Sequence, residues 1–118
     1  MSADDWLGLA PEHGDRREAL FGGSGAVRVW ELLPDAPTGP FVAALACALD
    51  VGGSVGAHVQ AREDEIVVCL EGLGAVTVAG VASAFAPGVA VYVPVGTTLS
   101  LRNEGDAPLR YLIVKATP

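Results

Sequence analysis

The stretch GGSVGAHVQAREDEIVVCLEG, residues 52–72, carries His58, Gln60 and Glu65 between glycines at both of its ends. A second stretch, GVAVYVPVGTTLSLRN, residues 88–103, also begins with glycine and contains a Pro-Val-Gly turn signal. In both stretches apolar residues recur with a period of two, which is typical of β-strands with a buried face. They therefore predict four strands, and one of the sheet faces carries polar side chains.

Glycine and proline divide the rest of the chain in the same way. The 15 glycines and 8 prolines separate short runs rich in valine, leucine and alanine, as in β-barrels and sandwiches. We expect strands over residues 27–33, 42–50, 57–60, 66–70, 75–78, 89–93, 98–102 and 109–115. Their number and spacing favour an all-β fold, a small jelly-roll β-barrel.

The amino-terminal part has a different pattern. Residues 12–21 are compatible with a short helix, with Asp15 as its cap. We therefore divide the chain into a partly helical extension, residues 1–25, and a barrel domain, residues 26–118. A length of 118 residues supplies one hydrophobic core and is too short for two.

Composition and charge limit the classes of function. Hydrophobic residues make up 51% and charged residues 18% of the chain, as in globular proteins. The net charge of −7, with one lysine and six scattered arginines, argues against a nucleic-acid partner and an anionic membrane surface. No apolar run approaches the roughly 20 residues that span a membrane, and the amino terminus does not resemble a secretory signal. We expect a soluble, cytoplasmic protein.

The two cysteines give no sign of a metal site. Cys47 and Cys69 lie in apolar segments and lack the spacing of metal-binding cysteines. Buried, reduced thiols are therefore favoured, and a disulfide is the alternative. Cys69 has no basic neighbour in sequence, so we expect it to pack as a small hydrophobic residue.

Strand alternation predicts which side chains face the barrel interior. The residues expected to point inward are His58, Gln60, Glu65, Val67, Cys69, Leu99, Leu101 and Asn103. Imidazole, amide and carboxylate groups are costly to bury without partners. This interior polarity indicates either a ligand site or a hydrogen-bonded pair, whereas Asn103, at a strand end, is expected to bond to the backbone.

Both stretches resemble the two conserved motifs of the cupin family. The matching positions are Gly52, His58, Gln60, Glu65 and Gly72 in the first motif and Gly88, Pro94, Gly96, Leu99 and Asn103 in the second. The family places a second histidine where Gln60 stands and a third where Leu99 stands. The resemblance implies a metal-binding β-barrel, a fold used by dioxygenases, isomerases, epimerases, decarboxylases, cyclases, sugar-binding sensors and seed storage proteins.

The resemblance also implies a degenerate metal site. His58 and Glu65 match ligand positions, Gln60 is a substitution and Leu99 is a loss. A neutral amide oxygen is a weaker ligand than imidazole, so the surviving set favours either no cofactor or a weakly held Mn²⁺ or Fe²⁺. The alternative is a metal-free pocket in which His58 and Glu65 are hydrogen-bonded to each other, as an acid–base pair or as satisfied core groups.

Two functions follow from these residues. The first is a binding module that holds a small organic ligand in the barrel. Its expected ligand-binding residues are His58, Gln60, Glu65, Val67, Cys69, Leu99 and Leu101. The alternative is a cupin enzyme of the dioxygenase, isomerase, epimerase or cyclase type, in which His58, Gln60 and Glu65 hold a metal or His58 and Glu65 transfer protons. We favour the first because Leu99 removes a ligand and adds apolar wall.

The outward faces of the strands predict a homodimer. Ile66, Val68 and Leu70 point away from Glu65 on their strand, so both faces of this part of the sheet are apolar. A partner's sheet can cover the outer face, and a two-fold pairing is the commonest closed arrangement. Alternatively, residues 1–25 cover the face of their own barrel.

Overall fold

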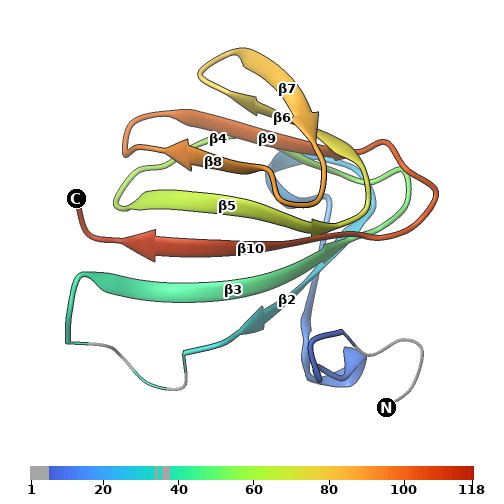
Figure 1. Cartoon of the computed structure of the whole chain (residues 1–118), viewed down its shortest axis with the longest axis horizontal. Helices are drawn as coiled ribbons and strands as arrows, with labels where there is room; N and C mark the ends of the chain where they lie inside the picture. Colours follow the sequence, from blue (N-terminus) through green and yellow to red (C-terminus); the bar gives the residue numbers. More distant parts are fainter. Residues whose placement is uncertain (1–5, 34, 36–37) are drawn as a thin grey trace.

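The computed structural model describes residues 6–33, 35 and 38–118, and it is built almost entirely of strands (Figure 1). The strands are β1 (Asp15–Glu18), β2 (Ala26–Glu31), β3 (Phe41–Leu49), β4 (Ser54–Val59), β5 (Asp64–Glu71), β6 (Gly74–Val78), β7 (Val81–Phe85), β8 (Ala90–Val93), β9 (Thr98–Asn103) and β10 (Leu109–Ala116). Two single 3₁₀ turns, η1 (Pro11–His13) and η2 (Leu20–Gly22), flank β1.

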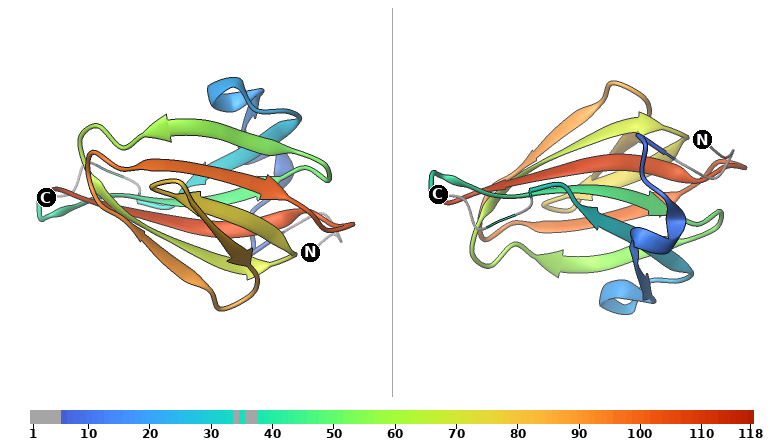
Figure 2. Two further views of the ribbon diagram at one scale, coloured as in Figure 1. Left: turned by 90° about the horizontal axis from the view of Figure 1, so that it is seen from above. Right: turned by 90° about the horizontal axis from the view of Figure 1, so that it is seen from below.

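The strands form two antiparallel sheets that pack face to face, as Figures 1 and 2 show. The larger, six-stranded sheet has the order β1-β2-β3-β10-β5-β8, and the smaller, four-stranded sheet has the order β4-β9-β6-β7. Most pairings join strands that are not consecutive in the chain, such as β10 with β3 and with β5. This arrangement confirms the expected jelly-roll β-barrel.

Each of the eight expected strand ranges overlaps an observed strand. Two strands were not expected. β1 has the sequence DRRE, which is exposed throughout and has no apolar alternation, and β7 has the sequence VASAF, in which only Phe85 is buried. Both lie at a sheet edge, where one neighbouring strand supplies the backbone hydrogen bonds and no hydrophobic pattern is needed.

The helix expected over residues 12–21 is wrong. This segment contains the end of η1, then β1, then the start of η2. Ala19 and Phe21 have φ values of 48° and 54°, a left-handed conformation that interrupts any α-helix. β1 pairs with β2, so the amino-terminal extension adds an edge strand to the larger sheet.

The core lies between the two sheets. Its largest fully buried side chains are Tyr111, Phe85, Leu49, Leu99, Leu109, Val27, Val67, Val76 and Val93, together with the two cysteines. The rings of Phe85 and Tyr111 meet edge to face with centroids 6.1 Å apart. Both cysteines are free and buried, as expected for reduced thiols.

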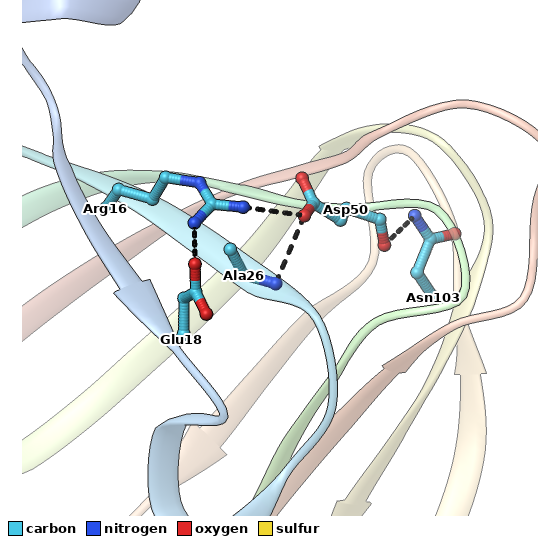
Figure 3. Close-up of polar contacts among 5 residues, drawn as sticks. All are labelled: Arg16, Glu18, Ala26, Asp50 and Asn103. Carbon is cyan, nitrogen blue, oxygen red and sulfur yellow. Dashed lines mark hydrogen bonds and ion pairs between the residues drawn. The ribbon is translucent and has the colours of Figure 1, made fainter.

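Asp50, just after β3, joins β1, β2 and the end of β9 (Figure 3). Its carboxylate accepts a hydrogen bond from the Ala26 amide at 3.1 Å and lies 4.0 Å from the guanidinium of Arg16, which also pairs with Glu18. Its main-chain carbonyl accepts from the Asn103 side chain at 3.0 Å. This cluster ties the edge strand β1 to the barrel that it flanks.

Residues 6–11 cover one part of the outer face of the larger sheet. Trp6 and Trp30 pack edge to face with centroids 6.2 Å apart, and the Trp30 indole donates a hydrogen bond to the Ala10 carbonyl. Leu70 and Leu112 pack against this pair. Both tryptophans are therefore packing anchors, and the chain covers this part of its own sheet.

Another part of the same outer face is open. Ile66 pairs with Tyr92 on β8 and with Val114 on β10, and these three side chains form a row across the sheet. Ile66 is 47% exposed and Tyr92 is 60% exposed.

Among the described helices of the chain, none is long and apolar enough to cross a membrane.

We predict that two copies pair through this open row. Light scattering coupled to size exclusion at micromolar concentration is then expected to give twice the 12.0 kDa mass of the chain. Ile66→Glu places a charge in the apolar contact and should give the monomer mass. Val81→Glu, at an exposed apolar residue of the smaller sheet, is the matched control and should leave the dimer intact. A monomeric wild type would contradict the prediction.

Asn103 is predicted to be a structural residue. Its Nδ2 lies within 3.1 Å of three main-chain carbonyls, those of Leu49, Asp50 and Ala107, and its Oδ1 accepts the Gly105 amide at 2.9 Å. Asn103→Ala should lower the free energy of unfolding by about 2 kcal/mol, because it leaves buried carbonyls without donors. Urea denaturation measures this loss, and Asp106→Asn, exposed in the same loop, should be neutral. A loss below about 0.5 kcal/mol would contradict the structural role.

Candidate functional site

A cavity of about 290 Å³ lies between the two sheets. β5 and β10 of the larger sheet and β4 and β9 of the smaller sheet contribute to its walls, and β1 and η2 lie along its side. The polar residues that line it are Arg17, His58, Gln60, Arg62, Glu63, Glu65, Tyr111 and Lys115. Its apolar lining comes mainly from leucine, isoleucine and valine side chains of the core.

The cavity brings together most of the residues expected from the sequence. His58, Gln60, Glu65, Leu99 and Leu101 all line it. Leu99 is 2% exposed and points inward, as alternation predicted, so hydrocarbon fills this ligand position of the motif. The other two expected ligand-binding residues, Val67 and Cys69, are fully buried in the core and lie outside the cavity lining.

An irregularity in β4 aims His58 into the cavity. The register against β9 shifts between Val55 and His58, and both side chains line the cavity although they are three positions apart. The His58 Nδ1 lies 2.9 Å from the Gly56 carbonyl. Because a carbonyl only accepts, Nδ1 carries the proton, and in the neutral form of the ring Nε2 is left as an acceptor.

The turn η2 covers the other side of His58. The Phe21 ring stacks on the imidazole, with centroids 3.8 Å apart and an interplanar angle of 11°. This turn lies against β4, in agreement with Figure 2. Gly56 is required at this contact, since a Cβ there would collide with the Phe21 carbonyl.

Glu65 is a buried carboxylate with a cationic partner. Its residue is 3% exposed, and its Oε2 lies 3.5 Å from the Lys115 Nζ. Burial raises the pKa of Glu65 above its usual value, and the positive charge of Lys115 opposes this rise. Glu65 thus pairs with Lys115, and His58 bonds to Gly56; these partners replace the His58–Glu65 hydrogen bond that was considered as an alternative to a metal site.

Gln60 has an unpaired donor inside the protein. Its main chain is anchored to the loop before β9, where its amide donates to Thr97 and its carbonyl accepts from Gly96. The residue is only 7% exposed, and its side-chain Nε2 has no hydrogen-bond partner among the described residues. A buried amide without a partner costs about 1–3 kcal/mol. Because Gln60 also lines the cavity, its side-chain amide lies close to the space that a ligand would occupy.

Two further groups of the lining, the Cys47 thiol and the Tyr111 hydroxyl, are neutral near pH 7. Burial raises the pKa of the Cys47 thiol to about 12 and raises that of the Tyr111 hydroxyl well above its ordinary value. Neither group ionises near neutral pH. Cys47 therefore lacks the thiolate that nucleophilic chemistry requires.

The residues present do not fit a divalent metal ion. Catalytic metal sites use at least three good protein ligands, whereas this cavity offers one imidazole, one amide and one carboxylate, with Leu99 at the fourth position. The carboxylate is already held by an ammonium group at 3.5 Å. Within the described ranges, no three His, Cys, Asp or Glu side chains gather closely enough to hold an ion.

Two groups of cavity residues were missed by sequence reasoning. Lys115 shares an inward face with Tyr111 and Ile113 on β10, so the period of two in this strand contained the signal that its side chain would face the cavity. Arg17 and Phe21 carried no such signal. They reach the cavity only because the amino-terminal segment folds along β2 and β4.

Glu65 is predicted to make stability depend on pH. Because its folded-state pKa is raised, the folded protein binds this proton more tightly than the unfolded chain. Its contribution is therefore present below the unfolded pKa of about 4.5 and is lost as pH rises through the folded value. Glu65→Gln should remove this loss, so urea denaturation from pH 4 to 8 should show the variant gaining stability relative to wild type as pH rises. Glu63→Gln, at the rim, is the control; parallel curves for Glu65→Gln and wild type would contradict the prediction.

Comparison with known proteins identifies the family. The sequence profile of the Cupin domain matches residues 46–115, which is more than half of the chain and includes the cavity residues of β4, β5, β9 and β10. A search of curated protein sequences found no match.

Solved structures agree with the profile. A protein from Thermotoga maritima described as a predicted oxalate decarboxylase has a TM-score of 0.83 and 27% identity, over 89% of this chain and 92% of that one. A Cupin 2 conserved barrel domain protein from Salinispora arenicola has a TM-score of 0.66 and 28% identity, over 76% and 75%. The cupin domain of Schizosaccharomyces pombe Cnp3, at 19% identity and a TM-score of 0.73 over 95% and 74%, shares the fold. With both motifs, the barrel and the profile match in agreement, the chain belongs to the cupin family as a small Cupin 2 barrel.

Proposed function

We propose that this cupin binds a compact organic ligand, with an apolar body and a hydrogen-bond-accepting oxygen, without using a metal ion. The observation that carries the proposal is the Gln60 Nε2, a buried donor without a partner among the described residues, on a side chain that lines the cavity. A ligand oxygen that accepts this hydrogen bond removes the free-energy cost of the unpaired amide. The removal of this cost makes ligand binding more favourable.

Cavity size and lining support a small, partly apolar ligand. Ligand pockets commonly measure about 300–1,000 Å³, and this one, at about 290 Å³, lies at the lower end. Leu99 and Leu101 supply apolar wall beside the polar group of Gln60 and His58. Three cationic residues line the cavity against two acidic ones, although the whole chain carries a charge of −7. This local excess favours an oxygen with negative charge or partial negative charge.

One structural relative supports an oxygen-rich ligand. The Thermotoga maritima protein is described as a predicted oxalate decarboxylase, and oxalate is a small dicarboxylate. The apolar wall made by Leu99 and Leu101 here favours a ligand with more hydrocarbon than oxalate. We therefore take from this relative only the preference for carboxylate or carbonyl oxygen.

Proton transfer is a second candidate function, favoured by the raised pKa of Glu65. A carboxyl group with a raised pKa beside a cavity is a common general acid or base. His58, with Nε2 as an acceptor, is the second group that could exchange a proton with a bound ligand. An enzyme of this kind would lose turnover in Glu65→Gln while keeping its ligand affinity.

The binding proposal is tested with a pair of shape-matched probes, acetophenone and ethylbenzene, titrated into ¹⁵N-labelled protein. Acetophenone should shift the amide signals of cavity residues and bind more tightly than ethylbenzene, which lacks the oxygen. Gln60→Met keeps the side-chain shape and removes the donor, so it should weaken acetophenone binding about tenfold and leave ethylbenzene unchanged.

A control variant and the contradicting outcomes complete the design of this titration. Ser100→Ala, on the face of β9 away from the cavity, should behave as wild type with both probes. Equal affinity of wild type and Gln60→Met for acetophenone, or no shift of any cavity signal, would contradict the proposal.

A further inference from the structure

We infer that the Lys115 ammonium is the resident cation of this barrel: it holds Glu65 in place of a divalent metal and thereby excludes such an ion from the cavity. The inference concerns the protein's own charges and does not depend on the identity of any ligand. It assigns a role to a residue that lies outside both conserved motifs.

The backbone places this pair by register. Lys115 stands directly opposite Glu65 across the β10–β5 ladder, and both side chains line the cavity. On its other side Lys115 faces Ala43 of β3, whose small side chain leaves the lysine free to lean toward Glu65. The Nζ to Oε2 distance of 3.5 Å places the ammonium against the carboxylate.

The charges explain why such a pair excludes a metal ion. Among the motif positions in the cavity, Glu65 supplies the carboxylate, His58 and Gln60 offer an imidazole and an amide, and Leu99 offers no metal ligand. A divalent ion that approaches Glu65 must displace the ammonium or remain beside it. The Glu65 carboxylate is buried and the Lys115 side chain is partly buried, so the surroundings screen the repulsion between two cations less than water does.

An ammonium group in place of a metal ion also changes the interactions that the cavity can make with a ligand. A metal ion accepts a lone pair from ligand oxygen, whereas an ammonium group has three N–H donors. The ammonium lies 3.5 Å from Glu65, and its N–H groups can also donate to an accepting oxygen of a ligand in the same cavity. Lys115 therefore supplies a positive charge at this position without the fixed coordination geometry that a metal ion requires.

The test restores the missing imidazoles and then varies only the lysine. Gln60→His and Leu99→His together rebuild the histidine positions of the motif, and this double variant is made with Lys115 and with Lys115→Met. Calorimetric titration with Mn²⁺, Co²⁺ and Zn²⁺ should show binding at least about tenfold tighter when the ammonium is absent. Equal affinity in the two backgrounds would overturn the inference.

A matched control separates local from overall charge. Arg102→Met in the same double-histidine background removes one positive charge from the exposed face of β9. It should leave metal affinity within about twofold of the Lys115-containing protein, because exposed charges at a distance are screened by salt. A gain as large as that of Lys115→Met would show that net charge, not the resident ammonium, sets the affinity.

A second measurement uses the wild-type cavity and no metal. Lys115 is the single lysine of the chain, so protein grown with ¹³C-labelled lysine gives one set of lysine signals. Glu65→Gln should shift the Lys115 Cε and Hε signals, and Glu63→Gln should leave them in place. Unchanged signals in Glu65→Gln would mean that the ammonium is not held by Glu65, which overturns the inference even if a histidine variant fails to fold. Neither experiment uses an organic probe, so failure here leaves the ligand-binding proposal standing.

Discussion

The pairing of β5 with β10 is the constraint on which the site depends. This ladder lies inside the larger sheet, and its register decides which side chains of both strands face the cavity. A slip of one residue would move Lys115 to the outer face and leave Glu65 buried without a cation. Burial of a lone carboxylate is far more costly than burial of a paired one, so the pair and the register support each other.

The apolar surroundings strengthen the electrostatic interactions of the polar groups in the cavity. Leu99 and Leu101 remove water from the neighbourhood of Gln60 and Glu65, and the same burial that raises the pKa of Glu65 makes the unpaired Gln60 amide costly. In a metal-binding barrel an ion would gather these groups. Here hydrocarbon replaces one ligand, an ammonium replaces the ion, and one amide donor has no partner in the part of the chain that the structure describes.

The amino-terminal segment contributes to the site as well as to stability. β1 brings Arg17 to the cavity, and η2 stacks Phe21 on His58. Farther toward the amino terminus, Trp6 packs on the opposite face of the larger sheet. One short segment thus reaches the cavity and also the outer face of the larger sheet. Its sequence has no strand or helix pattern strong enough to predict this.

The sequence by itself determined the barrel, the boundaries of most strands and the inward direction of His58, Gln60, Glu65 and Leu99. These features follow from local alternation and from turn residues, which act over a few positions of the chain. The partners of these side chains were decided only by the tertiary structure. The contact of Glu65 with Lys115 joins residues 50 positions apart, and that of His58 with Phe21 joins residues 37 positions apart. Such contacts depend on ladder register and on the path of an irregular segment, and neither is encoded in the period of a single strand.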